Sequence, residues 1–398
     1  MILGGGIQGL VLLRDLTEAQ YACVLITNAD LGSGQTLHSH GLLNSGTSLL
    51  TGALHEELYR LTLPYLSRLS VPVYGEDRSF LLAPNPLVDQ LTPAWEANAY
   101  HPQLVSPSSL PLGFEPVGST YRVRGVNVDK RRMVEALAAG LEHLVVRGEV
   151  VDANDGVRVR EAASEEVLSF QPRAVVVAAG CGSKRLLRNI FAVQEPALAK
   201  ITYTKLHMIC VMAPAEVLPQ IGTILSPELI VVGHSHTDAD RSQERLVTWY
   251  VTPAGAAPVR HADAPDDASA EVEGPVVTSG IEALVRLFPR LANDNDGVQA
   301  TVFAGFKQEF DGVPTLRACE LVDPERNLLM VLPSVLANAV PNSVEAVSVL
   351  RQRLGEPAGR ADDIRHHGGA ATGRLNELSD HTTWTNWGDF ARRYGVIT

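Results

Sequence analysis

The feature that most constrains the fold is a glycine-rich turn near the start of the chain. The spacing Gly4-x-Gly6-x-x-Gly9 follows a short apolar run and precedes residues 10–19, whose apolar side chains recur at helical spacing. A second apolar run follows at residues 23–26. This order is typical of a βαβ unit that binds a dinucleotide, because small turn residues let a diphosphate approach the N–H groups at the positive helix end. We therefore expect a dinucleotide site here.

The acidic residue that usually ends the second strand of such a unit, and binds the ribose, is missing. Thr27 and Asn28 occupy its position, and Asp30 lies slightly beyond. Thr and Asn can hydrogen-bond a ribose hydroxyl, but without the charge that strengthens such bonds. We therefore expect weakened or rearranged binding of the adenosine half.

The rest of the chain carries patterns of both helices and strands. Asp129 is predicted to cap a helix over residues 130–141, and residues 174–180 are typical of a buried parallel strand that ends in small residues. Alternating apolar residues over 200–251 predict an antiparallel sheet. The proline-rich residues 75–125 predict loops and strands of another layer. The polar residues 261–274 predict an exposed insertion.

Composition excludes several classes of function. The formal net charge of −12 argues against nucleic-acid binding, which needs clustered Lys and Arg. The sequence contains no stretch of about 18 uncharged apolar residues, so no membrane span is predicted. The cysteines form no CxxC pair, which predicts neither a disulfide framework nor a zinc site, and we therefore expect a protein of the reducing cytoplasm. The cysteines are Cys23, Cys181, Cys210 and Cys319.

Taken with the glycine turn, further segments resemble, in the same order, those of the D-amino-acid oxidase and glycerol-3-phosphate dehydrogenase superfamily of FAD enzymes. GSGQTLHSHGLLNSG at 32–46 is similar to the flavin-contacting loop of L-2-hydroxyglutarate dehydrogenases and to the Thr-Trp-His-Ala-Ala-Gly-Leu stretch of dimethylglycine and sarcosine dehydrogenases. VNVD at 126–129 and VVVAAGCGS at 175–183 resemble segments that lead to the adenine and flank the diphosphate. FAGFKQEFDGVP at 303–314 resembles the Ala-Gly-Leu-Arg-Pro…Asp-Gly-Pro region. Residues 327–347 resemble the strand, loop and helix whose N-terminal end faces the flavin pyrimidine.

This resemblance implies an α/β fold, α+β overall, with a Rossmann-type FAD-binding domain and a mixed β-sheet substrate domain. The FAD-binding domain would be discontinuous, and the substrate domain would cover the flavin. The implied segments are 1–74, 126–200 and 311–354 for the FAD-binding domain, and 75–125 and 201–310 for the substrate domain. The resemblance does not extend beyond about residue 355, and residues 355–398 are expected to form a polar tail.

The resemblance also implies which residues bind FAD. They are the glycine turn, the end of the second strand, the flavin-contacting loop, the end of the 174–180 strand and the start of the last helix. By number they are Gly4, Gly6, Ile7, Gln8, Gly9, Thr27, Asn28, Gln35, Thr36, His38, Gly41, Leu42, Val150, Ala179, Gly180, Asn338 and Ala339.

Three side chains are candidates for the chemistry. His38 and His40 are expected near the flavin ring, because imidazole can accept a proton near neutral pH. In dimethylglycine and sarcosine dehydrogenases the histidine that matches His38 carries the flavin covalently; alternatively, His38 hydrogen-bonds backbone. Lys307 stands where the superfamily usually has Arg, and would orient a substrate anion, act on oxygen or water, or lie solvated at the surface.

No metal site is expected. His207, His234 and His236 lack a carboxylate partner at an obvious offset, so they are expected to line a pocket or lie at the surface. Tyr203 and Tyr250 are candidates for pocket lining, although aromatic residues in a sheet are more often core.

These features together predict an FAD-dependent oxidoreductase. It would oxidise the C–H next to a hydroxyl or amine of a small, anionic organic substrate by hydride transfer to the flavin. Oxygen, a quinone or an electron-transfer partner would reoxidise the flavin. Two alternatives stay open: an amine or amino-acid oxidase of a specialised pathway, and a flavin-binding subunit without catalysis of its own.

Overall fold

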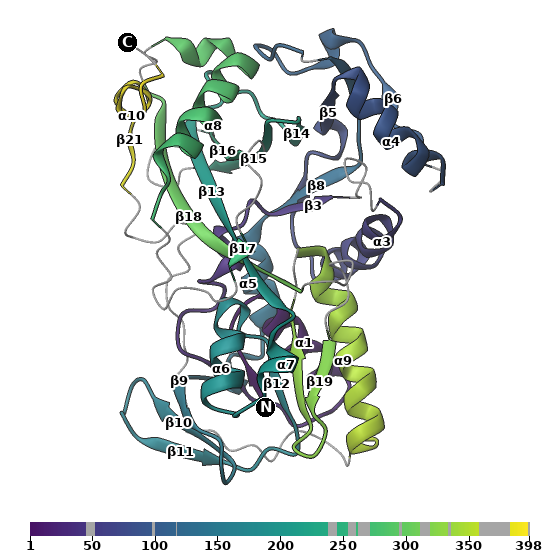
Figure 1. Cartoon of the computed structure of the whole chain (residues 1–398), viewed down its shortest axis with the longest axis vertical. Helices are drawn as coiled ribbons and strands as arrows, with labels where there is room; N and C mark the ends of the chain where they lie inside the picture. The colour runs from purple at the N-terminus through teal and green to yellow at the C-terminus, as the bar shows by residue number, and fades with distance from the viewer. Residues whose placement is uncertain are drawn as a thin grey trace.

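Two large β-sheets and the helices packed on them make up most of the structure (Figure 1). The structure is a computed structural model. It describes residues 1–44, 52–97, 100–116, 118–237, 245–253, 260–261, 271–293, 297–310, 319–332, 336–357 and 383–396. The predicted exposed insertion at 261–274 lies mostly outside these residues, as does Asp-Gly-Val-Pro at the end of the 303–314 segment.

The first sheet has eight strands in the order β11-β10-β9-β2-β1-β12-β20-β19. Its central strands, from β9 to β20, pair in parallel, which confirms the predicted parallel strand after residue 174. The strands are β1 (Ile2–Leu3), β2 (Leu25–Thr27), β9 (Val145–Asp152), β10 (Val157–Glu161), β11 (Val167–Phe170), β12 (Val175–Val177), β19 (Cys319–Asp323) and β20 (Leu328–Val331).

Helices cover both faces of this sheet. Ile2 joins an apolar core with one set of helices, whereas the next residue, Leu3, joins a core on the opposite face, as expected for alternating strand residues. Asp129 caps α5 through a bond from Arg132 N (2.9 Å), which confirms the predicted cap. One face carries α1 (Ile7–Glu18), α5 (Lys130–Ala138) and α9 (Ala339–Leu354), with α3 (Gly52–Arg68) against α9; the other carries α6 (Ser183–Asn189) and α7 (Glu195–Leu198).

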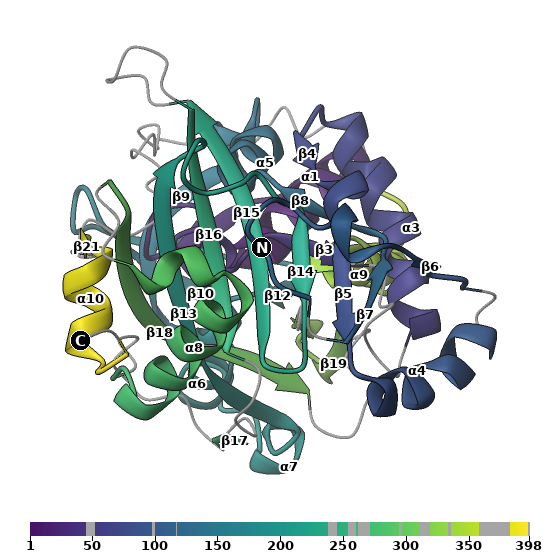
Figure 2. The same cartoon turned by 90° about the horizontal axis from the view of Figure 1, so that it is seen from above.

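The second sheet lies beyond the ends of the first and follows the order β21-β18-β13-β16-β15-β14-β5-β7-β6 (Figure 2). The antiparallel pairing of β13, β15 and β16 confirms the sheet predicted over 200–251, and α8 (Gly274–Leu287) packs on one face. The strands are β5 (Phe80–Ala83), β6 (Gln103–Leu104), β7 (Ser119–Arg122), β13 (Ile201–Pro214), β14 (Thr223–Leu225), β15 (Leu229–Thr237), β16 (Arg245–Pro253), β18 (Gln299–Phe310) and β21 (Thr385–Asn386), with β17 (Arg260–His261) beside β13.

A small third sheet joins the two large ones. Its order is β3 (Leu42–Asn44), β8 (Gly125–Val128), β4 (Val73–Tyr74). The buried amide of Asn127 on β8 donates to Gly222 O and Gly233 O, both at 2.7 Å, and accepts from the Thr223 hydroxyl at 2.9 Å. Asn127 therefore fixes this sheet to the loop before β14 and to β15.

Residues 75–125 contain a helix that their prolines concealed. Alongside β5, β6 and β7, α4 runs over Asn85–Ala97 with Pro93 inside it. Leu91 and Trp95 of α4 are buried, and they lie four residues apart, on one face of the helix. Packing of that face outweighs the cost of the internal proline.

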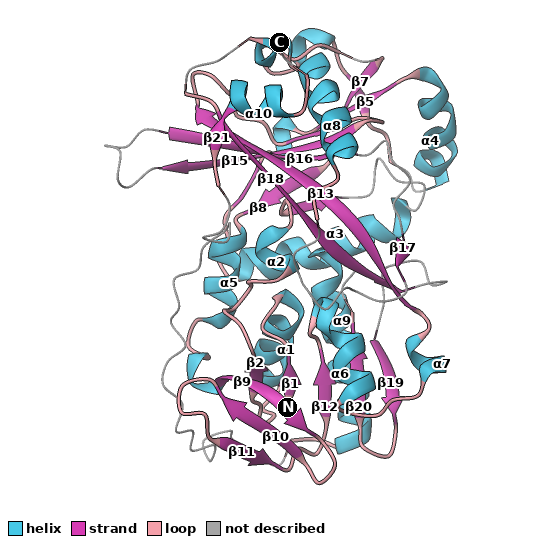
Figure 3. Cartoon of the chain, turned by 60° about the vertical axis from the view of Figure 1, so that its left-hand side comes forward, coloured by secondary structure: helices cyan, strands magenta, loops and turns pink. Residues whose placement is uncertain are grey.

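The prediction of a polar tail from residue 355 is wrong for residues 383–396. β21 pairs with β18, and α10 (Trp387–Arg393) follows it at the edge of the sheet (Figure 3). Trp387 and Phe390 are buried in the core beneath α8, and the Asn386 side chain caps α10. Two aromatic residues three apart behind an N-cap form an apolar helix face. In the described part of the chain, no helix is long and apolar enough to cross a membrane.

Candidate active site

The glycine turn links β1 to α1 by close backbone packing. Gly4 has a φ of +121°, in the region that favours glycine, and a Cβ on Gly9 would lie 1.9 Å from Gly4 O. By contrast, a Cβ on Gly6 would meet only the Thr36 hydroxyl, at 3.3 Å. The first turn of α1 carries no acidic side chain. The turn therefore combines tight packing on one side with room for an anion at the helix end.

The structure brings several predicted cofactor-binding segments together around this turn. Thr36 of the loop before β3 accepts a hydrogen bond from Ile7 N (2.9 Å). The buried Gln8 donates to Ala339 O at the start of α9 (3.1 Å). A Cβ on Gly180 would lie 3.2 Å from the Gln35 amide oxygen. The turn, the loop, the end of β12 and the start of α9 thus form one cradle.

Buried polar groups beside the cradle test whether FAD fits it. Gln308 is 2% exposed, and neither polar atom of its amide has a hydrogen-bond partner among the described residues. It lies opposite Tyr203, whose hydroxyl is 3.4 Å from Cys181 O, in the turn at residues 180–182. The hydroxyl of Ser183, also buried, likewise lacks a described partner. Unpaired buried polar groups are costly, and a ligand rich in hydroxyl and phosphate oxygens would pair them. The residues present therefore fit FAD.

The carboxylate that follows the predicted ribose-binding residues Thr27 and Asn28 is paired. Thr27 turns its hydroxyl back to Ala29 O (2.9 Å), and Asn28 is exposed. Asp30 forms an ion pair with Arg147 at 2.8 Å. Val150 is buried on β9 and contributes to the core of the sheet. Asp30 remains 41% exposed but is paired, which leaves Asn28 as the exposed polar side chain here that could bind a ribose.

Lys130 fixes the loop that carries the two candidate histidines. It is fully buried and donates to Leu37 O (2.9 Å) and Ser39 O (2.7 Å). Its ammonium lies 4.0 Å from the centre of the Tyr250 ring. Next to these contacts, Gly41 adopts a φ of +72°, and a Cβ there would lie 2.9 Å from Val128 O. The loop therefore has one tightly specified path.

His38 and His40 carry their protons on different ring nitrogens. His38 Nδ1 lies 3.0 Å from Gly34 O, and because a carbonyl only accepts, Nδ1 is the donor and Nε2 is left as the basic nitrogen. His40 Nδ1 instead accepts from Leu42 N (3.2 Å), so the neutral ring of His40 carries its proton on Nε2. His38 also packs its ring edge-on against Phe303, with centroids 5.5 Å apart.

The electrostatic environment keeps His40 neutral. Burial, together with the positive charges of Lys130 and Lys307, lowers the pKa of His40 to about 4. Uptake of a proton would place it on Nδ1 and break the bond from Leu42 N. His40 is therefore suited to donate a hydrogen bond through Nε2 rather than to accept a proton.

Lys307 is not a solvated surface lysine, because its ammonium is paired. It lies 2.9 Å from a carboxylate oxygen of Glu309, two residues along β18 on the same face. The other oxygen of Glu309 accepts from the Thr204 hydroxyl at 2.8 Å. Lys307 and Glu309 are mostly buried, with 27% and 17% of their side chains exposed. The positive charge of Lys307 contributes to the lowered pKa of His40.

Two further histidines singled out in the sequence, His207 and His234, have structural partners. His234 is buried, and its Nε2 lies 2.8 Å from His40 O. His207 accepts at Nε2 from Glu273 N (3.0 Å), before the first turn of α8, and burial lowers its pKa. The side chain of His236 lies outside the described residues. Within the described residues, no group of three or more His, Cys, Asp or Glu side chains is arranged to hold a metal ion.

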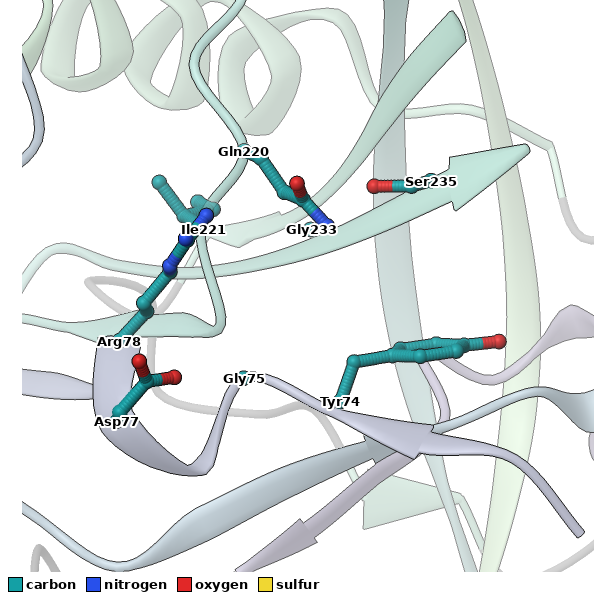
Figure 4. A pocket seen from close by; sticks show the side chains of 8 residues that line it. All are labelled: Tyr74, Gly75, Asp77, Arg78, Gln220, Ile221, Gly233 and Ser235. Carbon is teal, nitrogen blue, oxygen red and sulfur yellow. The ribbon is translucent and has the colours of Figure 1, made fainter. Parts of the chain in front are cut away.

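A cavity of about 220 Å³ lies between β4 and β15 (Figure 4). Five side chains with polar groups line it: Tyr74, Asp77, Arg78, Gln220 and Ser235. None of its lining residues belongs to the predicted cofactor-binding or catalytic set.

Sequence reasoning missed Lys130 and Glu309. Lys130 is the first residue of a predicted helix, where a lysine is usually solvated, and its partners lie about 90 residues away. Nothing local reveals its burial. The pairing of Glu309 with Lys307 could have been predicted from the sequence, because side chains two apart on a strand share a face and opposite charges there form a pair.

The comparisons with known proteins agree on one family. The family model described as FAD dependent oxidoreductase matches residues 1–332. The probable FAD-dependent oxidoreductase PA4991 of Pseudomonas aeruginosa is 26% identical over 274 residues, which are 63% of this chain and 67% of that protein.

Solved structures share the fold. The crystal structure of PA4991 superposes with a TM-score of 0.63 at 23% identity, covering 89% of this chain and 90% of the other. Glycine oxidase of Geobacillus kaustophilus gives 0.62 at 18% identity, covering 88% and 92%. The FAD-bound L-α-glycerophosphate oxidase of Mycoplasma pneumoniae gives 0.65 at 16% identity, covering 88% and 94%. With the family model spanning most of the chain, these likenesses confirm the superfamily predicted from the motifs: the protein belongs to the FAD-dependent oxidoreductases, and FAD is its cofactor.

Proposed function

We propose that this oxidoreductase oxidises the C–H bond next to an amine or hydroxyl group of a small, anionic organic molecule. The observation that carries the proposal is that the two imidazoles on the loop fixed by Lys130 have opposite hydrogen-bonding roles. His38 offers a basic nitrogen and His40 a neutral donor. Removal of a hydride from such a carbon needs both a proton acceptor and a group that orients the heteroatom.

In this proposal the chain divides its work between the two sheets. The eight-stranded sheet with its helices forms the FAD-binding domain, and the ten-stranded sheet forms the substrate domain. FAD, when bound in the cradle of the glycine turn, supplies the hydride acceptor. His38 accepts the proton at Nε2, and His40 orients the substrate through Nε2–H. Lys307 attracts the anionic group, sharing its charge with Glu309.

The Lys307–Glu309 pair favours an amine over a hydroxyl group in the substrate. A lysine already paired at 2.9 Å attracts an added anion less than a free lysine would, whereas the Glu309 carboxylate can hold a substrate ammonium. Several proteins of the same fold are named for amine substrates, among them glycine oxidase, L-proline dehydrogenase of P. horikoshii and an iminodiacetate oxidase of Chelativorans. These observations support the narrower alternative, an amine or amino-acid oxidase.

Anaerobic mixing with a panel of small amines, amino acids and hydroxy acids tests the proposal. At least one compound is expected to bleach the visible flavin bands of the purified protein. Lys307→Met is expected to slow that reduction at least about 10-fold, because it removes one charged hydrogen bond. Lys200→Met is the matched control, since it breaks the comparable pair with Glu320 on the other sheet.

Two outcomes would contradict the proposal. A yellow protein that no compound reduces would favour the flavin-binding subunit without catalysis. A colourless protein that cannot be reconstituted with FAD would reject the cradle itself. After acid denaturation, flavin that stays with the polypeptide would indicate attachment at His38, and flavin that leaves would indicate a noncovalent cofactor. Admitting air after reduction then tests whether oxygen serves as the acceptor, or whether a quinone or protein partner is needed.

A further inference from the structure

The cavity between β4 and β15 has the chemistry of a binding site separate from the flavin cradle. Tyr74 on β4 lies opposite Asn127 on β8, which in turn lies opposite Leu42 on β3. Neighbouring strands are about 4.8 Å apart, so the Tyr74 backbone lies about 10 Å from the loop that carries the candidate histidines. One strand, β8, therefore separates the cavity wall at Tyr74 from the strand that follows the histidine loop.

The walls of the cavity carry unmatched hydrogen-bonding capacity. The Ser235 hydroxyl is buried, points into the cavity and has no hydrogen-bond partner among the described residues (Figure 4). The Gln220 amide and the Tyr74 ring line the same space. A buried hydroxyl without a partner is destabilising unless a ligand or water pairs with it.

Opposite charges stand at the mouth of the cavity. Asp77 and Arg78 follow the tight turn at Gly75, and both side chains are exposed. A guanidinium binds a carboxylate through two parallel bonds, and an aspartate binds an ammonium, so the two charges together suit a ligand that carries both.

The size of the cavity limits the ligand. Pockets for drug-sized ligands run to about 300–1,000 Å³, and a water takes about 30 Å³, so about 220 Å³ holds roughly seven waters or one small metabolite. We propose that this cavity binds a small zwitterion, with Arg78 holding its carboxylate, Asp77 its ammonium and Ser235 an interior polar group. This site goes beyond the proposed function and does not depend on it.

An anaerobic titration followed by ligand-detected NMR tests the site on the FAD-loaded protein. The probes are L-alanine and its two halves, propionate and ethylamine. L-Alanine is expected to bind at least about 10-fold more tightly than either half, since each half loses one charged contact. Arg78→Met and Asp77→Asn are each expected to weaken L-alanine binding about 10-fold. Arg122→Met is the matched control, because Arg122 is exposed on β7 and does not line the cavity.

Any of three results would overturn the proposal. The first is that the folded wild-type protein binds no L-alanine. The second is that it binds L-alanine no more tightly than propionate or ethylamine. The third is that Arg78→Met binds L-alanine with the same affinity as the wild type. Because the readout is binding and not turnover, these results stand whether or not the protein oxidises amines.

Discussion

The neutral state of His40 makes a quantitative prediction about stability against pH. Burial lowers the pKa of His40 from the ordinary value of 6.5 to about 4 in the folded protein. Between these values the unfolded chain binds a proton that the folded chain does not, so the free energy of unfolding falls as the pH falls. The contribution is complete above about pH 6.5 and lost by about pH 4. At about 1.4 kcal/mol per pKa unit, its upper limit is about 3 kcal/mol.

His40→Asn isolates this effect, because an asparagine oxygen can still accept the bond from Leu42 N but does not titrate. Urea unfolding followed by tryptophan fluorescence, at about pH 7.5 and about pH 5, gives the free energy of unfolding of both proteins. The wild type is expected to lose about 2 kcal/mol more than the variant over this range. All other titrating groups are common to both proteins and cancel in the difference.

The comparison can refute the reasoning clearly. If the wild type and His40→Asn lose the same stability within about 0.5 kcal/mol, then His40 titrates normally and is not held neutral by its surroundings. If the variant loses more, His40 gains a proton on folding, and its bond to Leu42 N is not the one that fixes its tautomer.

Three further variants probe the scaffold of the site. Lys130→Met leaves two buried loop carbonyls without a donor and is expected to cost about 2–5 kcal/mol in urea unfolding, with a rise in the pKa of His40 seen by NMR. Gly9→Ala is expected to abolish FAD retention, because its Cβ meets the Gly4 carbonyl, whereas Gly34→Ala, with nothing within 4 Å, is expected to keep the yellow colour after gel filtration. Asn127→Leu breaks three buried hydrogen bonds and is expected to cost about 2–4 kcal/mol by the same unfolding assay.

The fold around the glycine turn was largely predictable because its signals are local. The glycine turn, its strand and its helix are contiguous, and the Asp129 cap is a feature of four neighbouring residues. Pattern reading failed where packing outweighs composition. Prolines concealed α4, and an overall polar composition concealed α10, although Trp387 and Phe390 already have helical spacing.

The substrate side was less predictable because its partners are distant in sequence. Thr204 reaches Glu309 across two paired strands, and that register is set by the hydrophobic pattern of the entire sheet. Lys307 could be identified as a departure from the usual arginine, but a departure does not say what the lysine pairs with. The charge balance of the site therefore needed the structure.

The two histidines show this limit most clearly, because they differ by two positions in one loop and have opposite proton arrangements. The role of an imidazole depends on what its other nitrogen binds. For His38 that partner is the Gly34 carbonyl, one helical turn earlier in the chain. For His40 it is an amide two residues later, where Gly41 has a positive φ and the chain leaves the helix for β3. The end of one short helix thus places a basic nitrogen and a neutral donor on the same loop, and a base in this pair must be His38.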